Sequence, residues 1–161
     1  MDGLQVERLA KALSISRSGF YWHFNNRADF LKAMQTYWAQ QFTYRIIDEV
    51  LASAVDARSQ LAQLPRLINS YNATRCDPAM WVWAGADSDV KQLVNRVRDA
   101  RMKFVGSLIK QCGFSGADLK ARTRLFVVYF SWAGVMFDGE MTHGRPKAAN
   151  EIIDIILAPK A

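Results

Sequence analysis

The sequence predicts an all-α protein. Nearly every segment longer than ten residues repeats its apolar side chains with the 3.6-residue period of an amphipathic helix, and no segment shows the alternating pattern of a half-buried strand. Glycine, serine and proline stand at breaks between these segments. The chain has 161 residues, of which 50% are hydrophobic, so it is long enough to bury a core without disulfides or metals.

The first two predicted helices are short. One face of a helix near the start of the chain is formed by Val6, Leu9, Ala10 and Leu13. A second helix spans residues 16–24, and the hydroxyl of Ser16 is its expected N-cap. Phe20 and Phe24 lie four residues apart and therefore share one face of this helix.

A long helix is predicted to follow. Asn26 is placed to cap it, and Asp29 stands three residues later, as in a capping box that uses Asp instead of Glu. Its apolar positions are Phe30, Leu31, Met34, Tyr37, Trp38, Phe42, Ile46 and Val50. The pattern predicts a helix that runs to about Ala54 and is roughly 40 Å long.

The rest of the chain is also predicted to be helical. Pro65 is expected to kink or divide a helix over residues 58–73, because proline removes a hydrogen bond and clashes with the preceding turn. Gly113 and the Ser115-Gly116 pair are expected to end a long helix. The later helices are predicted over residues 78–84, 88–112 and 117–141, with a break at residues 143–146 before a final helix to about Leu157.

The net charge of +6 is unevenly distributed. Residues 91–124 hold nine basic and two acidic side chains, including Arg96, Lys103 and Lys110 at sevenfold spacing, together with Arg98 and Arg101. This block is either a nucleic-acid face or the solvated face of an amphipathic helix, and the spacing favours the second interpretation. No apolar run approaches the ~20 residues of a membrane span.

The function-bearing motif lies in the first 31 residues. Two helices joined by a turn of about four residues form a helix-turn-helix unit. Arg17, Ser18 and Trp22 project away from the Phe20 and Phe24 face, on a helix of a size that fits the major groove of DNA.

The string LAKALSISRSGFYWHFNNRADFL, residues 9–31, resembles the DNA-binding signature of the tetracycline-repressor (TetR) family of bacterial transcription regulators. The shared features are the Leu-Ala pair, the Ser cap after the turn, the aromatic run through His23 and Phe24, and a basic and an acidic residue opening the next helix. The resemblance implies a DNA-binding domain over residues 1–34 and an all-helical effector-binding and dimerisation domain over residues 35–161. It implies a cytoplasmic, ligand-responsive repressor that acts as a homodimer, and the isolated Cys76 and Cys112 suit a reducing compartment.

The resemblance also implies roles for individual residues. Tyr21, His23 and Arg27 match positions that contact the DNA backbone, and Ser16 caps the recognition helix at the phosphates. The surface that would read base edges consists of Arg17, Ser18, Gly19 and Trp22. Packing between helices is the alternative role for Tyr21 and Trp22.

Two departures from the family pattern matter. Ser14 stands where the family often has glycine, which costs conformational freedom if its φ is positive. Family members also carry a helix before the position of Leu4, for which this sequence has no room. We therefore expect incomplete cover for Val6, Leu9, Phe20 and Phe24, and weak or no DNA binding by these 161 residues.

The later helices hold two further candidate sites. An apolar pocket for a hydrophobic small-molecule effector is predicted from Met80, Trp81, Trp83, Met102, Phe126, Tyr129 and Phe130. A four-helix homodimer interface is predicted from Phe130, Ala133, Gly134, Phe137, Ile152 and Ile156. Filling of the subunit's own core is the alternative for both sets.

Motifs for an enzyme, a cofactor or a metal are not evident in the sequence. It contains no GxSxG, HExxH, P-loop or GxGxxG motif, and His23 and His143 are too isolated to form a metal site. The expected partners are a hydrophobic small-molecule effector, a second copy of the chain and, if the full protein carries the missing first helix, double-stranded operator DNA; no membrane is expected. The alternative is a helical ligand-binding and dimerisation protein that has lost DNA binding.

Overall fold

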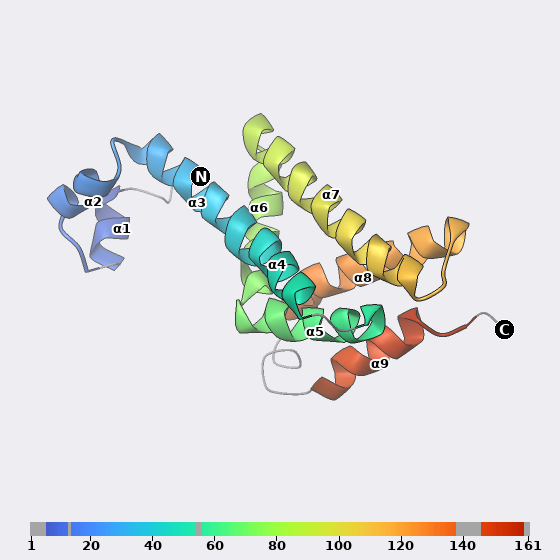
Figure 1. The fold of residues 1–161 in the computed structure, drawn as a ribbon. Coiled ribbons are helices and arrows are strands. Elements are labelled where there is room, and N and C mark those ends of the chain that lie inside the picture. The colour runs from blue at the N-terminus through green and yellow to red at the C-terminus, as the bar shows by residue number, and fades with distance from the viewer. Residues whose placement is uncertain (1–5, 13, 54–55, 138–145, 160–161) are drawn as a thin grey trace. The chain divides into compact units, whose positions relative to one another are not determined.

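The computed structural model describes residues 6–12, 14–53, 56–137 and 146–159, and every regular element in these ranges is a helix. The predicted all-α class is therefore confirmed (Figure 1). The chain folds as two compact units, Met1–Trp38 and Ala39–Ala161. The sequence placed its domain boundary four residues earlier, between residues 34 and 35.

The first unit contains the two short helices and the start of the long one. Helix α1 spans Val6–Ala12, α2 spans Arg17–His23, and α3 spans Arg27–Ala39. Leu13, which was expected on the apolar face of α1, lies outside the described residues.

The long predicted helix is interrupted by one π-helical turn. After α3, the π-helix η1 spans Gln40–Tyr44 and α4 spans Arg45–Ala52. The Arg45 N–H bonds to the Gln40 carbonyl, five residues back, instead of four. The apolar period alone did not predict this turn, because the backbone stays helical on both sides of it.

Helices α5, Ala57–Ser70, and α6, Ala73–Ala84, are joined by a two-residue turn. Asn72 makes this turn with a φ of 52°, in the left-handed region that asparagine tolerates better than most residues. The prediction that Pro65 divides its helix is wrong, since α5 continues through it. The short helix predicted from Pro78 instead begins at Ala73, with Pro78 inside.

The remaining helices are long. Helix α7 spans Ser88–Gln111 and α8 spans Gly116–Met136. Gly113 ends α7 with a φ of 97°, as predicted for a C-terminal glycine. Helix α9 spans Pro146–Ile156 and opens with proline, which suits the first helical position. The break predicted at residues 143–145 lies outside the described residues.

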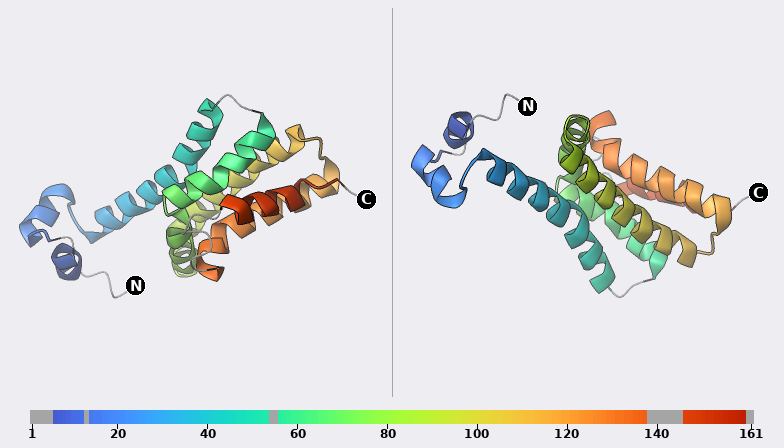
Figure 2. Two further views of the ribbon diagram at one scale, coloured as in Figure 1. Left: turned by 90° about the horizontal axis from the view of Figure 1, so that it is seen from below. Right: turned by 90° about the horizontal axis from the view of Figure 1, so that it is seen from above.

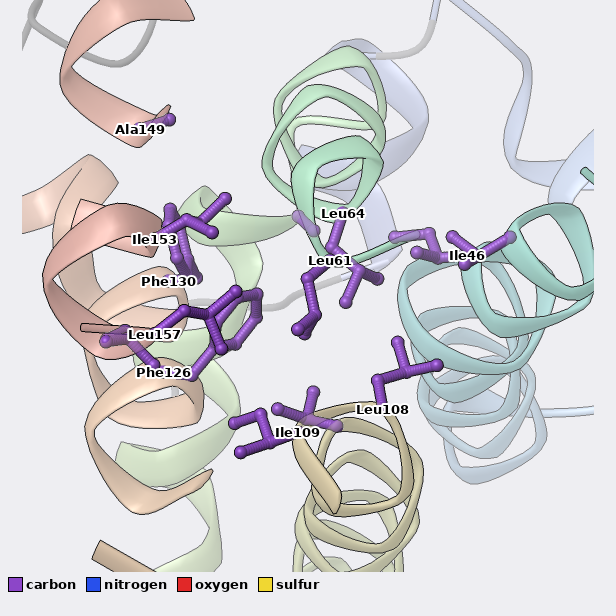
Figure 3. Packing of buried hydrophobic residues seen from close by; sticks show 14 residues of the cluster. Ile46, Leu61, Leu64, Leu108, Ile109, Phe126, Phe130, Ala149, Ile153 and Leu157 are labelled. Atoms are coloured by element: carbon purple, nitrogen blue, oxygen red, sulfur yellow. The ribbon is translucent and has the colours of Figure 1, made fainter. Parts of the chain in front are cut away.

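The core of the second unit lies between α4, α5, α7, α8 and α9. In Figure 3 the side chains of Leu61, Ile109 and Phe126 point toward one another from three of these helices. Helices α6, α7 and α8 pack against one another, and α9 packs against α5 and α8, as the left view of Figure 2 shows. This packing fixes the helices that carry the sites described below.

Candidate nucleic-acid interface and effector cavity

The turn between α1 and α2 is tight. Ser14 has a φ of 55°, so the positive φ considered for this position is present. The Ile15 N–H donates to the Ala10 carbonyl at 2.9 Å, and the Ser14 N–H donates to the Lys11 carbonyl at 3.2 Å. Serine in this conformation carries a steric cost that glycine would avoid.

Ser16 caps α2, as predicted. Its backbone is extended, and its hydroxyl oxygen accepts a hydrogen bond from the Gly19 N–H at 2.9 Å. The Ser16 and Ser18 hydroxyl oxygens also lie 2.9 Å apart. A Cβ on residue 19 would stand 3.2 Å from the capping oxygen, so glycine leaves room for the cap. The start of α2 is thereby fixed by its own sequence.

The inner face of α2 is an aromatic cluster. Phe20 is buried, and its ring centroid lies 5.3 Å from that of Phe24 and 5.4 Å from that of Phe30. The expectation of incomplete cover is wrong for Val6 and Phe20, which are both buried, because α1 and the rings that follow Phe20 enclose this face. Leu9 and Phe24 are half-buried.

The outer face of α2 is solvent-exposed. Trp22 is 82% exposed, which argues against the packing role considered for it. Its ring makes an edge contact with His23, with the ring centroids 4.7 Å apart. The Tyr21 ring packs edge-on against Phe20, as considered for it, and remains 44% exposed. The Arg17 guanidinium lies 5.8 Å from the centre of the Tyr21 ring, a cation–π distance.

The start of α3 is capped by the predicted pair. The Asn26 side-chain oxygen accepts from the Asp29 N–H at 2.9 Å. The Asp29 carboxylate reaches back to the Asn25 N–H at 3.2 Å, one residue before the position that a capping box uses. Arg27 is exposed at the first position of this helix.

Residues 1–34 match the family model for bacterial regulatory proteins of the tetR family. The N-terminal segment is a TetR-family domain. No curated protein and no solved structure matches the chain. The matched segment holds α1, α2 and the start of α3, so the family assignment applies to residues 1–34.

The second unit contains a cavity of about 50 Å³. Of the seven residues predicted for an effector pocket, Phe126 and Phe130 line it. Its other walls come from η1, α4, α5, α6, α7 and α8, and include Ile46, Leu64, Phe104 and Val127. The wall is apolar except at one polar end.

The other five predicted pocket residues lie elsewhere. Met80 and Trp83 are buried in α6, while Trp81 lines a surface depression that also includes Lys91. Met102 lines a separate groove formed by residues of α7 and α8. Tyr129 is half-buried and packs edge-on against Phe130. Aromatic composition alone could not separate residues that line a cavity from those that fill a core.

Sequence reasoning missed the polar end of the cavity. It is formed by Thr43, Asp77, Arg101 and Ser131. Arg101 was counted with the basic face of its helix, and of that group Arg96, Arg98, Lys103 and Lys110 are indeed exposed. The helical period could have indicated that Arg101 faces the core, because it stands four residues from both Val97 and Val105, which are buried on the core face of α7.

Most of the residues predicted for a dimer interface are covered within the chain. Phe130, Ala133 and Ile156 are buried, and Ile152 is half-buried. Gly134 makes the predicted close helix approach, but to Thr74 of α6 in the same subunit. Phe137 is exposed. The large apolar side chains that α8 and α9 expose are instead Leu125, Val128, Val135, Met136 and Ile155.

Two general properties complete the description of these sites. Among the helices that the structure describes, none is long and apolar enough to cross a lipid bilayer. In the described part of the chain, no three His, Cys, Asp or Glu side chains gather where they could hold a metal ion.

Proposed function

We propose that this chain is a ligand-responsive repressor that binds operator DNA as a homodimer. The observation that carries the proposal is the division of α2 into a buried Phe20 face and an exposed face bearing Arg17, Ser18, Tyr21 and Trp22. A helix anchored by a buried aromatic residue can present a fixed set of side chains to the major groove. The TetR-family domain supplies the DNA-binding context.

The exposed residues divide into two roles in this proposal. Arg17, Ser18 and Trp22 face the base edges, with Gly19 allowing close approach, where an arginine can donate to guanine and an indole can pack on a thymine methyl group. Tyr21, His23 and Arg27 contact phosphates and fix the register of the helix on the duplex. Ser16 acts through its cap, which orients the first turn of α2.

A second copy of the chain is the proposed occupant of the apolar surface on α8 and α9. Leu125, Val128, Val135 and Met136 recur on one side of α8 at spacings of three, seven and one residues, and Ile155 stands on α9. Met136 and Ile155 are each 69% exposed. Pairing of these two helices with their symmetry mates would bury the surface in an isologous four-helix arrangement. This set replaces the buried residues of the sequence-based prediction, and it excludes Gly134, which packs against Thr74 of the same subunit.

The effector is proposed to bind in the cavity lined by Phe126 and Phe130. Two of its lining residues, Phe42 and Thr43, belong to η1, which continues the helical run that starts at Arg27. A ligand that prefers one arrangement of η1 would bias the DNA-binding state by its difference in affinity between the two arrangements. The regulator acts in the cytoplasm in this proposal.

The DNA-binding part is tested by selecting duplex fragments with the chain and titrating the best fragment by fluorescence anisotropy. Because weak binding is expected, the titration extends to tens of micromolar protein at low salt. Arg17→Ala should weaken binding to the selected site by about 1–3 kcal/mol and relax the preference at one base pair. Arg27→Ala should weaken all sequences alike and lower the salt slope by about one. Arg66→Ala, which removes an exposed charge from α5, is the matched control.

The dimer part is tested by light scattering at micromolar concentration. The parent chain should have the mass of two subunits, and Leu125→Lys with Val128→Lys should give a folded monomer. A monomeric parent chain would refute the dimer. Ligand binding and dimerisation without any DNA selection would favour the alternative, a helical ligand-binding protein that lacks DNA binding.

A further inference from the structure

The polar end of the cavity is a hydrogen-bonded network of four side chains. Arg101 binds Asp77 through both terminal nitrogens, with the Nη2 to Oδ1 distance at 3.1 Å. Its Nε donates to the Thr43 hydroxyl at 2.9 Å, and its Nη1 also donates to the Ser131 hydroxyl at 3.3 Å. Asp77 is only 2% exposed. Helices η1, α6, α7 and α8 each contribute one member.

This network is electrically balanced. The guanidinium charge is matched by one carboxylate, and a further Nη2 hydrogen goes to the Phe42 carbonyl oxygen at 3.2 Å. A ligand that carried its own charge into this site would either bury that charge without a partner or break the Arg101–Asp77 pair. The site therefore discriminates against anions and cations alike.

The hydroxyl groups supply the recognition. Thr43 and Ser131 both accept hydrogen bonds from Arg101, so each keeps its own hydroxyl hydrogen to donate. Both residues line the cavity. A ligand with an acceptor oxygen can take a hydrogen bond at this end while its hydrocarbon part contacts Ile46, Phe104 and Phe126.

The volume limits the size of the ligand. The cavity of about 50 Å³ is well below the ~150 Å³ of an apolar cavity that accepts benzene. Even a ligand of about five heavy atoms would have to widen the cavity by moving its lining helices.

We infer that this cavity takes a small, uncharged, apolar molecule with one acceptor oxygen, such as a short-chain ketone, aldehyde or ester, held by the hydroxyl groups of Thr43 and Ser131. The inference rests on the effector cavity of the proposed function and specifies its ligand class. Thr43 selects for the acceptor oxygen of the ligand. Because Thr43 belongs to η1, the ligand contacts the element that directly follows α3.

The test uses three probes of five heavy atoms each: butanone, propanoate and sec-butylammonium. Binding is followed in the full chain by NMR of the methyl groups of Ile46, Ile47, Val105 and Val127, all of which line the cavity. Butanone should shift these signals to saturation, and both charged probes should bind at least roughly tenfold more weakly. Xenon, which enters apolar cavities without hydrogen bonding, reports that the cavity is intact.

Two variants isolate the hydroxyl groups. Thr43→Val and Ser131→Ala should each weaken butanone binding about fivefold while leaving the xenon-induced shifts unchanged. Three results would each overturn the inference. The first is propanoate binding as tightly as butanone, and the second is the absence of saturable shifts with butanone. The third is a butanone affinity in both variants equal to that of the parent chain, with xenon binding retained. The measurement reports ligand binding alone and requires neither DNA nor dimerisation, so a failure of DNA binding or dimerisation leaves its outcome intact, and the converse also holds.

Discussion

Gly134 is the position at which a single methyl group should be most costly. It lies near the end of α8, where the helix passes Thr74 in the first turn of α6. A Cβ added at residue 134 would stand 2.6 Å from the Thr74 Cβ and closer still to its hydroxyl oxygen. Real Cβ atoms essentially never approach other atoms this closely, so α6 and α8 must separate in Gly134→Ala.

The magnitude follows from two opposing effects. Alanine in place of glycine favours the helix by about 1 kcal/mol. Overpacking of a fitted contact costs about 1–3 kcal/mol, and this contact belongs to the upper part of that range, about 2–3 kcal/mol, because its backbone-proximal atoms cannot rotate away. We expect a net loss of about 1–2 kcal/mol in the free energy of unfolding, which lowers Tm by roughly 2–8 °C in a domain of this size.

Gly106→Ala is the matched control. Its added Cβ would lie 3.5 Å from the Thr123 hydroxyl oxygen, an ordinary contact, in the middle of α7. This variant should gain about 0.5–1 kcal/mol from helix propensity.

Thermal melts by circular dichroism at one protein concentration measure both variants, since dimerisation makes Tm depend on concentration. Thr74→Ala in the Gly134→Ala background should recover part of the loss, because it removes the hydroxyl and leaves the Cβ. A Gly134→Ala protein as stable as its parent would refute the close approach of α6 and α8.

Further predictions concern one cap, one turn and three titratable groups. Ser14→Gly should stabilise the N-terminal unit by about 0.5–1 kcal/mol, seen as slower amide hydrogen exchange in α1 and α2, because glycine adopts the positive φ without a clash. Ser16→Ala should destabilise α2 by about 1 kcal/mol in the same exchange experiment, because the Gly19 N–H loses its acceptor. The Tyr71 hydroxyl and Arg45 lower the pKa of Glu49, so the free energy of unfolding should fall as the pH drops below the ordinary glutamate range. Urea titrations at several pH values should show a smaller fall in Tyr71→Phe. The same bond to Glu49 raises the pKa of Tyr71, so the parent, unlike Tyr71→Phe, should also lose stability as the pH rises through the range in which tyrosine ionises. Burial raises the pKa of the Cys76 thiol, so iodoacetamide should label it more slowly at pH 8 than it labels a free cysteine, and equal rates would contradict the burial.

Local signals predicted most of the fold correctly. Ser16 and Asn26 are caps in the structure as in the sequence, and Gly113 ends α7, because each of these residues acts on a backbone group only two to four positions away. Proline misled the prediction at Pro65 and Pro78, where packing of α5 and α6 against the rest of the unit outweighs the lost hydrogen bonds. The 3.6-residue apolar period did not predict the π-turn η1, because this turn adds a single residue to an otherwise continuous helix.

The sequence by itself determined the helical class and the DNA-binding segment, since the exposed face and the buried Phe20 of α2 are both fixed by residues close together in the chain. Only the tertiary structure decided which apolar residues line the cavity and which remain exposed. It joined Thr43, Asp77, Arg101 and Ser131, which are up to 88 positions apart, and it covered Phe130, Ala133 and Ile156 within the subunit. The physical reason is that an amphipathic period marks an apolar face without specifying which surface covers that face.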